Sequence, residues 1–148
     1  MKKILIVMGT TFLIIIIILA IILLNLKNVN QGLRKENSEY EYYTNGEIFG
    51  TDITTLINKA MNNNIKHEIP RDENENFVQD EKYCIKIYVE MLGTGETYEM
   101  EKIAELGTNQ FVELFGTSTF KAKEVKYHKN TGRIAKIIFT QTVEWKVF

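Results

Sequence analysis

The pattern of hydrophobic and polar positions divides the chain into an apolar start and a mixed remainder. From Ile4 to Leu24 there are 21 residues without a charge, and a polar stretch follows. A helix needs about 20 apolar residues to cross the hydrocarbon core of a membrane. The pattern therefore predicts a transmembrane anchor in residues 1–26, a stalk or linker in residues 27–46, and one small folded domain in residues 47–148.

The apolar run is too long for an ordinary signal peptide. A signal peptide has an apolar region of about 7–15 residues that ends at a small-x-small cleavage site, whereas this run ends in "AIILLNLKNVN". We therefore expect a single-pass signal-anchor that contacts the lipid bilayer through residues 4–24. Basic residues nearly balance on its two sides, so the positive-inside rule decides little. Because only three residues precede the run, we expect the domain outside the cytoplasm.

The clearest soluble helix is predicted in "GTDITTLINKAMNNN", residues 50–64. Its apolar residues recur at the i, i+3, i+4, i+7, i+8 spacing of one helix face, namely Ile53, Leu56, Ile57, Ala60 and Met61. Thr51 or Asp52 can cap its start by accepting backbone N–H groups. We expect the Asn62–Asn64 triplet to end it, because asparagine tolerates the left-handed conformation.

Strict alternation in "YCIKIYVEM", residues 83–91, predicts a strand with one buried face. Cys84 and Lys86 fall on its other, more polar face. The next residues, "LGTGETYEME", predict a β-hairpin turned by Gly93 to Glu96. They lack the third glycine of a dinucleotide-binding fingerprint and the lysine of a P-loop. "KIAELGTNQFVELFG" then predicts a helix with a kink at Gly107 and an end at Gly116.

The last thirty residues predict a second hairpin. A change of parity near Lys123-Glu124 indicates a β-bulge, "KNTGR" supplies the turn, and Ala135, Ile137, Phe139, Val143 and Trp145 share one face of the final strand. Two hairpins and two helices make an α+β domain with an antiparallel sheet. We expect its core near Ile57, Ile87, Phe111, Ile137 and Phe139.

The charged residues and candidate reactive groups point away from several functions. The chain carries 18 basic and 19 acidic residues for a net charge of −1, which gives no field for capturing nucleic acid. Its two histidines, His67 and His128, lack metal-ligand spacing, and we expect His128 to be solvated at a hairpin end. Cys84 has no histidine near it in sequence and is interpreted as a bystander. We expect no catalytic residue, no cofactor and no metal, and no enzyme activity.

The loop "IPRDENENFVQDEK" is rich in acidic residues and invites comparison with a calcium site. An EF-hand loop needs alternating oxygen ligands and a glycine at its sixth position. Counting from Asp72, the sixth residue is Phe77. We therefore expect a solvated acidic loop.

A short basic amino terminus, a spanning helix that runs into a stalk and a small domain with an antiparallel sheet together resemble pilin-like and pseudopilin-like proteins. They are also similar to uncharacterised single-pass membrane proteins of low-GC Gram-positive bacteria, above all in "NGEIFGTDITTLINKAMNNN" after the stalk. The resemblance implies a role in building a surface apparatus. Gly9 could end a prepilin leader, although the fifth residue after it is Ile14 where such proteins usually carry glutamate.

Three functions from different classes remain open. The first is an anchored protein whose outer domain is a binding or assembly module, with a protein partner or a second copy of itself. The second is a pilin-like or pseudopilin-like subunit of a surface or secretion apparatus, distinguished by processing at Gly9. The third is a membrane-tethered enzyme, which a pocket joining His67 or His128 to carboxylates would favour.

Overall fold

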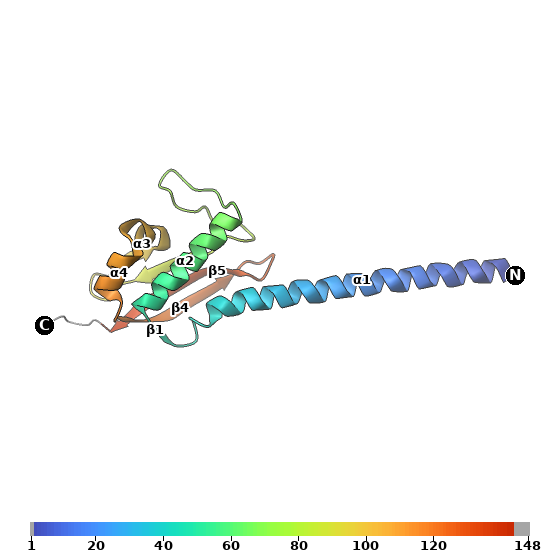
Figure 1. Cartoon of the computed structure of the whole chain (residues 1–148), viewed down its shortest axis with the longest axis horizontal. Coiled ribbons are helices and arrows are strands. Elements are labelled where there is room, and N and C mark those ends of the chain that lie inside the picture. The colour runs from blue at the N-terminus through green and yellow to red at the C-terminus, as the bar shows by residue number, and fades with distance from the viewer. Residues whose placement is uncertain (1, 144–148) are drawn as a thin grey trace. The chain divides into compact units, whose positions relative to one another are not determined.

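The computed structural model describes residues 2–143, so the expected place of Trp145 on the last strand lies outside the described residues, as does the side chain of Val143. Helix α1, Lys2–Glu41, comes first, and a sheet with three further helices follows (Figure 1). The chain divides into two compact units, residues 1–36 and residues 37–148. The boundary falls inside the range where the sequence predicts a stalk, and each unit is described by itself below.

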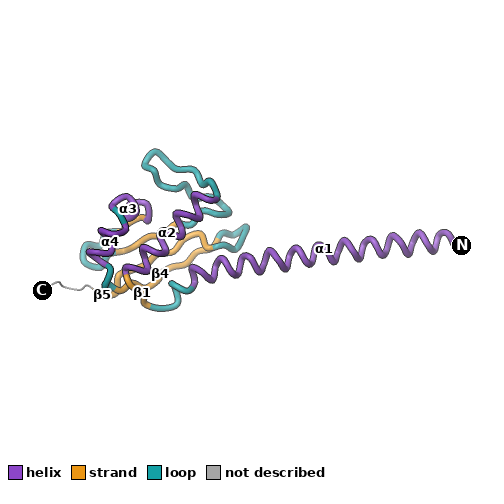
Figure 2. The backbone as a smooth tube through the Cα atoms, viewed as in Figure 1, coloured by secondary structure: helices purple, strands orange, loops and turns teal. Residues whose placement is uncertain are grey.

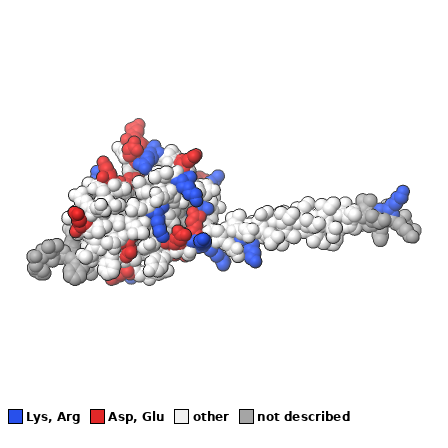
Figure 3. All heavy atoms as spheres, in the orientation of Figure 1, with Lys and Arg blue, Asp and Glu red and all other residues white. Residues whose placement is uncertain are grey.

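The first unit is helical and apolar. Residues Met8–Glu41 form a helix long and apolar enough to cross a membrane, with a mean hydropathy of 2.8 in its most apolar window and none of that window buried. Large side chains such as Phe12 and Leu24 are more than 60% exposed. Figure 3 shows this helix almost bare of charged side chains between its ends. Such a helix fits a single-pass membrane anchor or a signal sequence.

The second unit contains a five-stranded sheet. Its strands are β1 (Glu47–Phe49), β2 (Lys86–Glu90), β3 (Thr97–Glu99), β4 (Thr119–Tyr127) and β5 (Ile134–Val143), in the spatial order β1-β4-β5-β2-β3. The α+β class is confirmed. The sheet is mixed, however, because β2 runs parallel to β5 while every other pair is antiparallel. β4 pairs with one edge of β5, so the hairpin of β2 and β3 pairs with the other edge through β2.

Both predicted hairpins are present (Figure 2). In the first, the Met91 N–H donates to the Glu96 carbonyl at 2.9 Å and Gly95 takes a φ of +69°, a backbone conformation that glycine adopts without steric cost. In the second, the register shifts between Ala122 and Glu124, which places a bulge at the position that the change of parity predicts.

Helices α2 (Gly50–Lys66), α3 (Met100–Leu106) and α4 (Thr108–Phe115) cover one face of the sheet (Figure 1). The kink predicted at Gly107 is a full break with a φ of +94°, so one expected helix is two. At the start of α2, Asp52 Oδ2 accepts the Phe49 N–H at 3.0 Å. The expected end at the asparagine triplet is wrong, because α2 continues to Lys66 and Asn64 is fully buried.

The core lies between the three helices and the sheet. All five residues expected near its centre are buried, with Ile57, Ile87, Ile137 and Phe139 fully so. Sequence reasoning missed that the last turn of α1 joins this core: Tyr40 is buried, and the Asn37 side chain donates to the Gly132 carbonyl and accepts the Ile134 N–H. These contacts explain why the domain begins at Asn37.

Candidate functional site

A buried ion pair joins strand β2 to helix α3. Lys86 Nζ lies 2.7 Å from Glu101 Oε1, and the two side chains are only 7% and 6% exposed. A second carboxylate, Glu99 Oε2, lies 3.6 Å from the same nitrogen and is 43% exposed. Burial by itself lowers the Lys86 pKa, but the hydrogen bond to Glu101 and the negative charge of that residue raise it above the ordinary value. Lys86 is therefore held charged.

The local chain path explains this pair. Side chains alternate along a strand, so Lys86 points away from Ile87 and its neighbours in the core. β3 is only three residues long and ends at Glu99, so α3 begins beside the start of β2. Glu101 in the first turn of α3 then meets both Lys86 and the N–H of Phe77.

Glu101 is the one residue with an unsatisfied buried side-chain oxygen or nitrogen among residues 2–143. Its Oε1 accepts hydrogen bonds from Lys86 at 2.7 Å and from the Phe77 N–H at 3.0 Å. Its Oε2 is buried and has no hydrogen-bond partner in the described part of the chain. Leaving a buried acceptor unpaired costs about 1–3 kcal/mol. Such a group is a reason to look for a ligand or a missing donor at that point.

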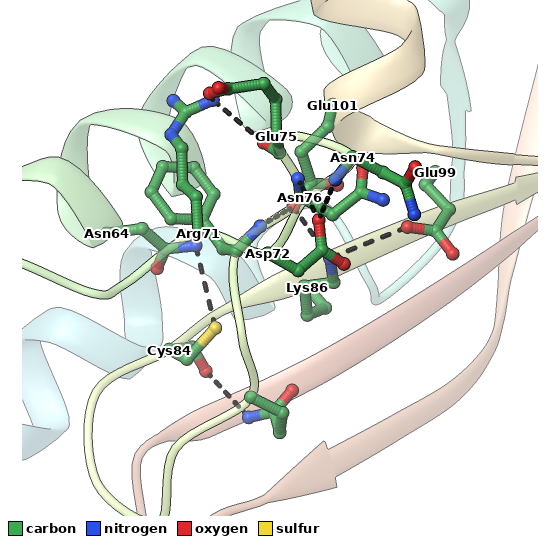
Figure 4. A network of polar contacts seen from close by, with 12 residues as sticks. Asn64, Arg71, Asp72, Asn74, Glu75, Asn76, Cys84, Lys86, Glu99 and Glu101 are labelled. Atoms are coloured by element: carbon green, nitrogen blue, oxygen red, sulfur yellow. Dashed lines mark hydrogen bonds and ion pairs between the residues drawn. The ribbon is translucent and has the colours of Figure 1, made fainter.

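The loop between α2 and β2 forms a wall beside Glu101 (Figure 4). Asp72 Oδ1 accepts the N–H groups of Asn74 and Asn76, both at 2.9 Å. The Arg71 guanidinium lies 4.3 Å from the centre of the Phe77 ring and donates to the Glu75 carbonyl. Four of the five acidic side chains of the expected loop are exposed, whereas Asp80 is half-buried and accepts backbone N–H groups. Nowhere between residues 2 and 143 do three His, Cys, Asp or Glu side chains gather to hold a metal ion.

A cleft of about 660 Å³ opens between this loop, α2 and α3. It is lined by Met61, Arg71, Asn74, Glu75, Asn76, Glu101, Lys102, Ala104 and Glu105. A neighbouring cleft of about 480 Å³ shares Asn76 and Lys102 with it and adds Glu96, Thr97, Tyr98 and Glu99. The two clefts therefore meet at Asn76 and Lys102, and Glu101 lines the larger one.

His128 is buried, and the expectation that it is solvated is wrong. Its Nε2 lies 2.8 Å from the Cys84 carbonyl oxygen. A carbonyl can only accept, so Nε2 carries the proton and Nδ1 is the acceptor in the neutral ring. The hairpin end is covered here by the residues before β2, a contact between positions 44 apart that no local pattern reveals.

His128 also lines a separate, shallow cleft of about 410 Å³ with Asp80 and Glu81. Burial opposes ionisation of Asp80, but N–H bonds from residues 82–84 outweigh it and hold the Asp80 pKa below its ordinary value. The cleft thus brings His128 to two carboxylates. This is the arrangement expected from the sequence for a membrane-tethered enzyme. Among the described residues that line it there is no serine, threonine or cysteine, and its one side-chain hydroxyl, that of Tyr127, donates a hydrogen bond to Glu41 Oε1 at 3.1 Å.

The remaining candidate residues serve packing. Cys84 is fully buried rather than on an open polar face, and burial raises its pKa to about 11. The thiol is therefore protonated at neutral pH. Asn64 Oδ1 accepts the Ile85 N–H and its Nδ2 donates to the Ile85 carbonyl. His67 follows the end of α2 and stacks on Tyr83 with 4.3 Å between ring centres.

Sequence reasoning missed the Lys86–Glu101 pair. The only available signal was a lysine flanked by Ile85 and Ile87 in a strand with one apolar face. Nothing in the sequence pointed to Glu101 as its partner. Comparison of the chain with protein-family models, curated proteins and solved structures found no match.

Proposed function

We propose that this chain is a single-pass membrane protein whose α+β domain lies outside the cytoplasm and is a binding or assembly module. The observation that carries the proposal is the apolar helix in which none of the most apolar window is buried. Apolar surface contributes roughly 25 cal/mol per Å² when it leaves water, so a long exposed apolar helix is strongly favoured to enter a bilayer. The domain behind it carries the clefts described above.

The membrane part of the proposal is tested by fractionation. The full chain expressed in bacteria is expected in the membrane fraction and to resist extraction with alkaline carbonate. Lysine at the centre of a spanning helix costs about 2.5–3.5 kcal/mol of insertion free energy, so an Ile16→Lys, Ile18→Lys double variant is expected to shift to the soluble fraction. The matched control is Ile16→Leu, Ile18→Leu, which keeps the run apolar.

The intact mass of the membrane-bound chain separates the anchor from its alternatives. A mature chain that keeps its first residues supports the anchor. A chain that begins at Thr10 favours the pilin-like function, and one that begins near residue 27 contradicts the anchor.

The side of the membrane is tested with a cysteine introduced at Glu73, an exposed residue of the acidic loop. The buried native thiol, Cys84, is expected to react slowly because it is protonated and closed off from solvent. A membrane-impermeant maleimide is expected to label the Glu73→Cys variant on spheroplasts without lysis. Labelling seen only after lysis would place the domain in the cytoplasm and overturn that part of the proposal.

A further inference from the structure

We propose that the cleft beside Glu101 binds a primary ammonium group, as carried by a lysine side chain of a partner or by a free polyamine. This inference rests on the proposed function as a binding module and names the chemistry of its ligand. Its first basis is the unpartnered Oε2 of Glu101, whose side chain is 94% buried and lines the larger cleft. An oxygen that only accepts requires a donor on the ligand.

The charges around the clefts favour a cation. The basic groups in and beside the clefts already have carboxylate partners. Arg71 Nη1 lies 3.7 Å from Glu75 Oε2, and Lys102 Nζ lies 3.3 Å from Glu105 Oε2. Lys86 Nζ lies 2.7 Å from Glu101 Oε1. Two further carboxylates, Glu96 and Glu99, line the adjoining cleft. Together there are five carboxylates and three basic groups, namely Glu75, Glu96, Glu99, Glu101 and Glu105 against Lys86, Arg71 and Lys102. The local excess of negative charge repels anions and leaves a neutral ligand without electrostatic attraction.

The geometry of Glu101 selects an ammonium group over a guanidinium. Arginine binds a carboxylate best through two parallel hydrogen bonds to both oxygens. Here Oε1 is already occupied by Lys86 and by the N–H of Phe77, so only Oε2 is open. An ammonium group is a compact donor of three hydrogen bonds, and one of them suffices for a single oxygen.

Binding requires a small opening of the cleft. Oε2 is closed off from solvent in the present conformation, so the ligand nitrogen must displace a side chain that lines the cleft. Lys102 is the candidate, because its side chain is 58% exposed, belongs to both clefts and is held by a single contact to Glu105. Glu99, at 43% exposure, offers the arriving cation a first point of contact.

The experiment is a titration of the isotope-labelled full chain in detergent micelles, followed by the backbone amide resonances. Three probes separate the outcomes: Nα-acetyl-lysinamide for a lysine side chain, spermidine for a free polyamine, and Nα-acetyl-norleucinamide as the uncharged control. Saturable shifts at the amides of Phe77, Glu101 and Lys102 are expected from at least one of the two charged probes and not from the control. Which charged probe binds more tightly identifies the source of the ammonium group. Equal shifts from the uncharged control, or none from either amine, would overturn the proposal.

Variants locate the binding. Glu101→Gln and Glu99→Gln are each expected to weaken amine binding about tenfold or more, because a charge-assisted hydrogen bond or an ion pair is lost. The matched control is Glu73→Gln, which changes an exposed acid of the loop between α2 and β2 outside both clefts and is expected to bind as the parent does. Glu99→Gln keeps the test decisive if Glu101→Gln fails to fold. Unchanged affinity in Glu99→Gln, and in Glu101→Gln where it folds, would contradict the site. Membrane fractionation is independent of this titration, so either proposal can fail alone.

Discussion

Two ion pairs of nearly the same length lie in very different surroundings. Lys86 and Glu101 meet at 2.7 Å with side chains 7% and 6% exposed, beside the first turn of α3. Lys123 Nζ contacts both carboxylate oxygens of Glu90 at 2.9 Å, with side chains 60% and 28% exposed, at the other end of strand β2. The two contact distances are nearly equal while the exposures differ, so the pairs show the effect of burial by itself. Burial decides how much free energy of unfolding is lost when one partner is removed.

The physical reason is the cost of removing charge from water. An exposed pair contributes about 0–1 kcal/mol, since water screens the charges and solvates each partner if the other is lost. A buried pair gains little over apolar residues of the same volume, but losing one partner strands a charge and costs about 3–5 kcal/mol. The surroundings of Lys86 and Glu101 are therefore far less tolerant of substitution than those of Lys123 and Glu90.

The largest expected effect comes from breaking the buried pair. Glu101→Ala leaves Lys86 charged and buried and removes the acceptor of the Phe77 N–H. We expect it to lower the free energy of unfolding by about 3–5 kcal/mol. Chemical denaturation of the full chain in micelles, followed by tryptophan fluorescence or circular dichroism, measures the loss. A loss below about 1 kcal/mol would mean that water reaches Lys86 in solution.

Replacing both partners is expected to cost less than replacing one. In a Lys86→Met, Glu101→Leu double variant no charge is left buried. The remaining cost is the unpaired Phe77 N–H, about 1–3 kcal/mol. The same denaturation series, analysed as a double-mutant cycle with the single variants, yields the coupling energy. If the double variant were as unstable as the sum of the two single ones, the pair would not be coupled.

The exposed pair is expected to matter little. Lys123→Ala removes the contact with Glu90 and should change the free energy of unfolding by about 0–1 kcal/mol. Lys121→Ala is the matched control, since Lys121 is an exposed lysine on the same strand. A difference of more than about 1 kcal/mol between these variants would indicate that another part of the molecule or a partner covers the Lys123–Glu90 pair.

The smallest expected effect is a pH dependence. Hydrogen bonds from Lys123 and Thr140 hold the Glu90 pKa below its ordinary value of 4.5. A carboxyl with a lowered pKa in the folded state stabilises the fold above the unfolded pKa, and this stabilisation disappears as the pH falls through the folded one. The stability of the parent and of Glu90→Gln should therefore differ slightly at pH 7 and converge as the pH falls through the lowered Glu90 pKa. Curves that stay parallel would show that Glu90 gains nothing from its partners.

Local patterns predicted the local elements well. Alternation predicted both hairpins, and the parity change predicted the bulge near Lys123. The glycine inside an apolar pattern predicted a kink at Gly107, where the structure has a break between two helices. These features depend on residues a few positions apart, whose backbone preferences and side-chain periods are visible in the sequence. The apolar helix was equally accessible, because length and composition alone decide whether a helix can span a bilayer.

Contacts between distant residues could not be predicted in the same way. The parallel pairing of β2 with β5 joins Ile87 to Ile137, and a strand pattern says nothing about which neighbour it takes. Asn64 was read as a helix end because asparagine favours turns, yet its amide completes the backbone hydrogen bonds of Ile85 from inside a helix. The candidate site depends on the same kind of contact, since Glu101 becomes exceptional only when Phe77 and Lys86 are brought beside it.

The lengths of the outer strands bear on how copies of the protein can associate through the sheet. Both outer strands of the sheet, β1 and β3, are only three residues long. Long open edges invite strand addition by neighbouring chains and lead to aggregation, whereas short edges give little template. Proteins tethered to a bilayer diffuse in two dimensions and collide often. In this sheet the outer strands offer little template themselves, but β1 pairs only with Thr119–Lys121 of β4, so a second copy that added a strand would do so along residues 122–127.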